Sequence, residues 1–79
     1  MEQIQKYQNA FISAFQVDEE KLEGLSYQSI TEWDSVGHMA LVAELEEAFS
    51  IQLEMDDVIE LNSFEKGKEI LAKYGVSMS

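Results

Sequence analysis

The chain of 79 residues contains no cysteine, which excludes disulfides, thiolate metal sites and a cysteine nucleophile. Proline is also absent, so any turns must be formed by Gly, Asn, Asp and Ser. A domain of this size buries only about 60% of the surface that its unfolded chain exposes, so we do not expect a deep catalytic cleft. Without a disulfide or a metal, such a domain needs a well-packed core, which is usually built from helices.

Basic residues are scarce, with five Lys+Arg against sixteen Asp+Glu and a formal net charge of −11. A chain this acidic repels phosphate backbones and anionic lipid, so we predict no nucleic-acid binding and expect partners with basic patches. Long apolar runs are missing as well, because the longest spans residues 39–43, far short of a membrane span. The first 15 residues lack the basic and apolar regions of a secretory signal. We therefore predict no membrane insertion and expect a cytoplasmic monomer.

Apolar residues recur at helical spacing in four segments. The three longer segments are 4–15, 34–49 and 64–74, and the short one is 56–61. Residues 17–33 lose this rhythm, and a loop of that length in a small domain is often functional. The pattern predicts one all-α domain over the whole chain, a small four-helix bundle with three main helices, one short helix and a long first loop.

Capping signals mark where these helices begin and end. Asp34 can accept backbone N–H groups from the first turn of the second segment, and Ser63 can do the same for the last segment. Gly75 is suited to the left-handed position that ends a helix. Ser35, directly after Asp34, should present its hydroxyl to solvent at the positive end of the helix dipole. On this dipeptide alone, a simple capping pair explains both residues.

The segment 34–49 has two apolar faces. One face carries a core stripe of Leu41, Val42, Leu45 and Phe49 with His38 beside it. The opposite face consists of Val36, Met39, Ala40, Ala43 and Glu47. Acidic side chains at 44, 46 and 47 are expected to surround this second face with negative charge. Its small residues either allow another helix to pack closely or dock a partner.

The stretch from Glu32 to Phe49 resembles the acyl carrier protein family, whose signature is Asp-Ser and an aliphatic residue followed by an amphipathic acidic helix. The connector at 51–53, the short acidic helix from Asp56 and the last helix from Phe64 to Tyr74 also match the family's order of elements. The resemblance covers essentially the whole chain. Each motif is weak alone, whereas the ordered set is specific.

The resemblance implies a non-catalytic carrier. It implies that Ser35 is esterified with 4′-phosphopantetheine, transferred from coenzyme A by a phosphopantetheinyl transferase, and that acyl groups travel as thioesters on this arm. Asp34 is implied in transferase recognition as well as in capping. The family docks basic patches of acyl-loading and acyl-transfer enzymes on the second face of this helix, which implies the same residues: Val36, Met39, Ala40, Ala43 and Glu47.

Two positions depart from the fatty-acid-synthesis carriers, because Gly37 and Ala40 stand where charged residues are usual. These departures favour a carrier of a specialised lipid, polysaccharide or secondary-metabolite pathway. Gly37 inside the first turn costs about 1 kcal/mol relative to Ala. Either the backbone needs freedom near the arm, or the position needs no side chain.

Two other functions remain as alternatives. The chain could be an unmodified docking subunit that binds basic partners through the 35–49 helix. It could also be a small hydrolase with Ser35 and His38 as nucleophile and base, although His38 lies on the core stripe and a structural role is favoured. Trp33 is expected to pack over the edge of the bundle. The acids Asp56, Asp57 and Glu60 are expected to form a solvated acidic face rather than a calcium loop.

Overall fold

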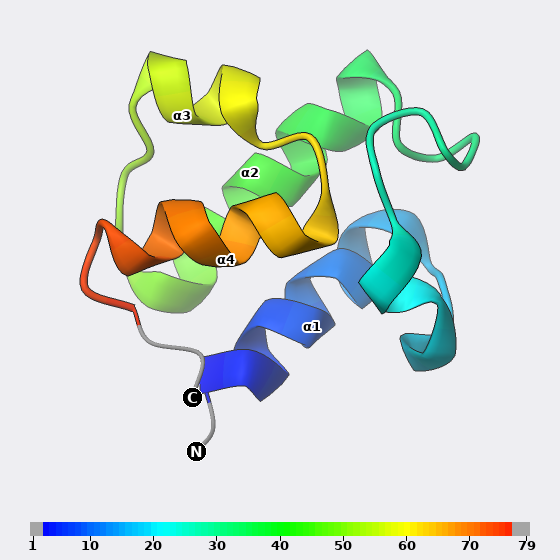
Figure 1. Ribbon diagram of the computed structural model, residues 1–79, viewed down its shortest axis with the longest axis horizontal. Coiled ribbons are helices and arrows are strands. Elements are labelled where there is room, and N and C mark those ends of the chain that lie inside the picture. Colours follow the sequence, from blue (N-terminus) through cyan, green and yellow to red (C-terminus); the bar gives the residue numbers. More distant parts are fainter. Residues whose placement is uncertain (1–2, 77–79) are drawn as a thin grey trace.

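The computed structural model describes residues 3–76 and contains only helices, turns and loops in that range. Figure 1 shows α4 crossing in front of α2, with α1 below and α3 above. The all-α prediction is therefore confirmed, with three main helices and short ones. The elements in chain order are α1 (Gln3–Phe15), the 3₁₀ helix η1 (Glu19–Gly24), α2 (Ser35–Phe49), α3 (Met55–Glu60) and α4 (Phe64–Ala72).

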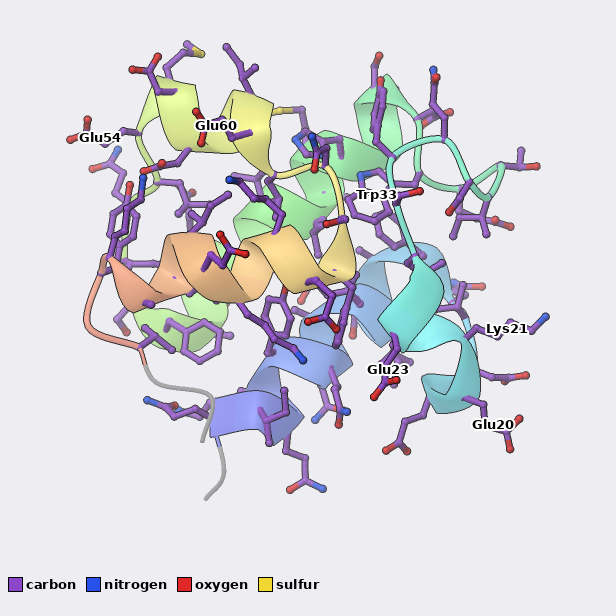
Figure 2. All side chains as sticks on the ribbon, viewed as in Figure 1. Glu20, Lys21, Glu23, Trp33, Glu54 and Glu60 are labelled. Carbon is purple, nitrogen blue, oxygen red and sulfur yellow. The ribbon has the colours of Figure 1, made fainter. Side chains whose placement is uncertain are left out.

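Aromatic rings form the centre of the core. Phe11 of α1 meets Phe64 of α4 edge-on, with ring centroids 5.0 Å apart. Phe15 stacks on Trp33 at 5.0 Å, and such pairs add about 0.5–1.5 kcal/mol to the free energy of area burial. Trp33 is fully buried, and Figure 2 shows its side chain between the long loop and the helices. The prediction that it packs over the edge of the bundle is therefore wrong, because the loop folds over the ring and covers it.

Helices α1 and α4 approach each other closely at one point. The buried Tyr7 hydroxyl donates a hydrogen bond to the carbonyl oxygen of Phe64 at 2.5 Å. A Cβ at Gly67 would overlap that hydroxyl and lie 2.9 Å from Leu61 Cδ1. Glycine is therefore required at 67 by space, and this contact could not be read from the sequence because its partners are about 60 residues apart.

The long first loop is anchored to the chain before α4. The Tyr27 N–H donates to the carbonyl oxygen of Asn62 at 2.8 Å, and the Phe64 N–H donates to that of Leu25 at 3.0 Å. Leu22 and Leu25 add buried side chains from the loop to the core. These contacts hold the loop that leads into α2, so the first turn of α2 has a fixed surrounding.

The acids of α3 do not share one environment. Asp57 is only 6% exposed, accepts hydrogen bonds from Lys73 Nζ and the Tyr74 hydroxyl, both at 2.5 Å, and forms an ion pair with Lys73. These two bonds, Lys73 first, lower the pKa of the Asp57 carboxyl. The prediction of a solvated acidic face is wrong for Asp57, because two partners distant in sequence satisfy its carboxylate. Figure 2 shows Glu54 pointing outward before α3, and the carboxylate of the exposed Glu60 lies 4.0 Å from Lys66 Nζ.

The ends of α4 follow the local signals. The Ser63 side chain accepts from the Lys66 N–H at 2.9 Å, as expected for an N-cap. Gly75 adopts a left-handed φ of 85°, and the Val76 N–H donates to the carbonyl oxygen of Leu71 at 3.1 Å. This is the bond pattern of a glycine stop. The predicted start of the helix and the role of Gly75 are confirmed, whereas the helix itself ends at Ala72, two residues before the predicted end.

Candidate functional site

The first turn of α2 lies at the end of the anchored loop. Asp34 precedes the helix in an extended conformation, and its Oδ1 accepts the Gly37 N–H at 2.8 Å. The predicted N-cap is therefore confirmed. This bond satisfies one of the backbone donors that a helix start leaves unpaired. The remaining N–H groups and the helix dipole favour a negative group here by about 0.3–1 kcal/mol.

Ser35 is the first residue of α2 and is exposed. Its Oγ lies 3.4 Å from the hydroxyl of Tyr27, a long contact at the surface. Tyr27 comes from the loop that leads to α2, and the sequence analysis did not single it out. An exposed serine hydroxyl with one weak neighbour is accessible to an incoming reagent.

The structure shows why glycine occupies position 37 in the first turn of α2. A Cβ at this position would overlap the carbonyl oxygen of Glu32 and lie 3.3 Å from Phe15 Cε1. Its φ is not in the left-handed region. The position therefore has no room for a side chain, because the loop backbone crosses directly over the first turn of α2.

An apolar groove of about 350 Å³ opens beside Ser35. The loop contributes Tyr27 to its lining, and α3 contributes Val58 and Ile59. The start of α2 contributes Ser35, His38 and Met39. The sequence predicted a short helix at 56–61 but neither its position beside α2 nor a groove between them. The only sign of the groove in the sequence is Ile59, an apolar residue that so short a helix does not need for packing against the core.

His38 lies inside this site and uses both ring nitrogens. The Trp33 indole N–H donates to Nδ1 at 2.9 Å, and Nε2 lies 2.7 Å from the carbonyl oxygen of Val58. The predicted structural role of this half-buried histidine agrees with these contacts. The hydrolase alternative lacks its general base here, because a base must be free to accept a proton from Ser35.

The second face of α2 is exposed along its length. Val36 is 80% exposed, and Met39, Ala40, Ala43 and Glu47 are exposed as well. In the described part of the chain, Ala40 and Ala43 therefore do not serve close packing by another helix. Two further apolar side chains on α3 extend this surface across the groove: Met55, 73% exposed, and Ile59, 69% exposed.

The acidic border of this surface differs from the expectation at two positions. Glu46 is half-buried, and its carboxylate accepts the Leu53 N–H at 2.9 Å. It fixes the connector after α2, where Ser50 takes a left-handed conformation. Glu44 is also half-buried and faces α1 beside Lys6. Glu47 is therefore the exposed acid of α2, and the prediction that three acids surround the second face is wrong for Glu44 and Glu46.

Residues 3–76 contain no cluster of three or more acidic or histidine side chains arranged to hold a metal ion. None of the described helices has the length and apolar character needed to cross a bilayer. Comparison with protein-family models, with curated proteins and with solved structures finds no match to this chain.

Proposed function

We propose that this protein is an acyl carrier that holds acyl groups as thioesters on a 4′-phosphopantetheine arm attached to Ser35. The observation that carries the proposal is the exposed Ser35 hydroxyl at the capped start of α2, directly beside an apolar groove. The ordered resemblance of the chain to acyl carrier proteins supports the same conclusion.

Because Ser35 is exposed, its hydroxyl would be open to a transferase. Its oxygen would bond to the phosphorus of coenzyme A that carries pantetheine. The pyrophosphate P–O bond would break, adenosine 3′,5′-bisphosphate would leave, and the hydroxyl proton would pass to a base of the transferase. The resulting phosphodiester is negative and sits at the positive end of α2, where Asp34 already holds the first turn.

The residues beside Ser35 fit an arm with apolar cargo. When bound, the arm would supply the thiol that this cysteine-free chain lacks. The groove walls from Met39, Val58 and Ile59 are apolar, and each methylene that leaves water contributes about 0.8 kcal/mol. A short acyl chain in this groove would therefore be retained by several such increments.

The exposed apolar surface of α2 and α3 would dock the partner enzymes. It consists of Val36, Met39, Ala40, Ala43 and Glu47 from α2, with Met55 and Ile59 added from α3. The net charge of −11 favours partners with basic patches around an apolar contact. The partners would be a phosphopantetheinyl transferase and enzymes that load and transfer acyl groups. Because Gly37 and Ala40 lack charge, we propose a specialised pathway rather than general fatty acid synthesis.

The test is intact mass before and after incubation with coenzyme A, magnesium and a broad-specificity phosphopantetheinyl transferase. The parent protein should gain the mass of one phosphopantetheine, and Ser35→Ala should gain none. Ser13→Ala is the matched control, because Ser13 is an exposed serine on α1, and it should be modified like the parent. An unmodified parent that is folded by circular dichroism would refute the carrier proposal.

That negative result would favour the second candidate, an unmodified docking subunit, which the exposed row from Val36 to Glu47 also supports. This candidate predicts that Ser35→Ala leaves partner affinity unchanged, whereas Val36→Glu weakens it.

A further inference from the structure

Among the segments that line the groove, α3 is the one that its own residues stabilise least. It has six residues, and isolated helices of that length are unstable in water. Asp57 is its one buried residue, Val58 is half-buried against the core, and Met55 and Ile59 remain exposed. With so little apolar burial of its own, its position depends in part on polar side-chain attachments to the rest of the chain.

One of these attachments crosses the groove from α2. Trp33 Nε1–H can only donate a hydrogen bond, so Nδ1 of His38 must be the acceptor. Nε2 therefore carries the proton and donates to the carbonyl oxygen of Val58. The direction of both bonds is thus fixed, from the indole through the imidazole to α3.

The Val58 carbonyl oxygen that accepts this hydrogen bond has no donor within its own helix. Val58 lies in the last turn of α3, where carbonyl groups lack an intrahelical donor. His38 therefore caps the C-terminal end of α3 from the side of Ser35. This contact is part-buried, and the loss of one hydrogen bond weakens the local structure by up to about tenfold in equilibrium terms.

Two aromatic rings also lie against the imidazole. Its ring is nearly parallel to that of Trp33, at 16° and 6.2 Å between centroids. The Tyr27 ring meets it nearly perpendicularly at 5.7 Å. Trp33 is fully buried, so the donor end of the relay is rigid and the position of His38 is set by the core.

We propose that His38 is a positioning residue that holds α3 as the wall of the groove and thereby shields cargo on the Ser35 arm from water. The holding of α3 is independent of any modification. The shielding of cargo rests on the proposed function, so the two parts are tested separately.

The first test uses the unmodified protein. Nitrogen NMR of the imidazole should show a protonated Nε2 and an unprotonated Nδ1, and a proton on Nδ1 instead would overturn the relay. Amide hydrogen exchange should be about tenfold faster over residues 55–61 in His38→Leu than in the parent. His38→Gln retains an acceptor and a donor in one side chain, and should restore most of the protection. Equal exchange over 55–61 in parent and His38→Leu would overturn the proposal.

The same comparison needs a control for global destabilisation. Exchange of the α1 core amides near Phe11 should change much less than exchange over 55–61 in His38→Leu. An equal change in both regions would mean that His38 supports the whole fold rather than α3, which also overturns the proposal. If His38→Leu does not fold, the imidazole NMR measurement and His38→Gln still decide the outcome.

The second test uses protein loaded by a transferase with an octanoyl-pantetheine arm. Hydroxylamine should cleave the thioester about tenfold faster in His38→Leu than in the parent, with His38→Gln close to the parent. Equal cleavage in all three loaded proteins would overturn the shielding. Failure to load the parent would instead refute the proposed function, and it would leave the result of the first test standing.

Discussion

Replacement of Gly37 by alanine sets two known effects against each other. Alanine in a helix interior is favoured over glycine by about 1 kcal/mol, so on propensity alone Gly37→Ala should stabilise α2. The surroundings of the position predict the opposite. The new Cβ would overlap the carbonyl oxygen of Glu32 and lie 3.3 Å from Phe15 Cε1.

The steric effect should dominate because the obstructing atom belongs to the backbone. The Glu32 carbonyl cannot rotate away as the end of a long side chain could, and the next residue is the fully buried Trp33. Either the loop or the start of α2 must move, and insertion of an atom into a packed region costs about 1–3 kcal/mol or more. After the propensity gain of about 1 kcal/mol is subtracted, we expect a net loss of up to about 2 kcal/mol.

The assay is urea unfolding followed by circular dichroism, with the free energy of unfolding obtained by linear extrapolation. Gly24→Ala is the matched control, because a Cβ at Gly24 would meet no described atom within 4 Å. The control should be neutral, or stabilising by up to about 1 kcal/mol. Equal stability of Gly37→Ala and Gly24→Ala would show that the Glu32 carbonyl does not pass as close to the first turn of α2 as the structure places it.

Three further predictions concern contacts elsewhere in the fold. Tyr7→Phe should lower the free energy of unfolding by about 1–3 kcal/mol in the same urea assay, because the Phe64 carbonyl loses its buried donor; an unchanged midpoint would contradict this. The pKa of Asp57 is lowered by its bonds to Lys73 and Tyr74, so its contribution is present above about pH 4 and is lost as the pH falls further. Asp57→Asn should therefore flatten the acid limb of melting temperature against pH, and an identical acid limb in both proteins would refute the attachment. The pKa values of Lys73 and Tyr74 are raised, chiefly by Asp57, so the same contact should be lost again only as the pH rises above about 10. Added salt should raise the melting temperature of a chain with a net charge of −11, and a flat salt dependence would exclude self-repulsion as a destabilising term.

Local signals in the sequence were sufficient to predict the starts of α2 and α4 and the role of Gly75. Asp34, Ser63 and Gly75 act within one turn of their own positions, so each could be assigned without knowledge of the tertiary structure. The exposure of Ser35 followed from the same reasoning. These are the parts of the candidate site that depend only on neighbours along the chain.

Contacts between distant residues could not be predicted in the same way. Asp57 looks like any surface acid until Lys73 and Tyr74 reach it from the end of α4. Trp33 looks like an edge residue until the loop closes over it. The groove beside Ser35 needs both α3 and the loop in place, so no single segment of the sequence contains it.

Aromatic packing and polar contacts hold different parts of this molecule. The first kind leaves its part rigid, and the second leaves its part easier to move. Aromatic packing joins α1 and α4 to the loop, so Asp34 and Ser35 start from a rigid base. Helix α3 packs Val58 against the core and is otherwise joined by polar contacts at two places, His38 on one side and the chain after α4 on the other. Polar contacts at a partly exposed position are worth less than buried aromatic area, so α3 is the element that can move at low cost. The proposed carrier function, which would require a cargo to be both sheltered and released, would use α3 as the movable wall of the groove that Ser35 also lines.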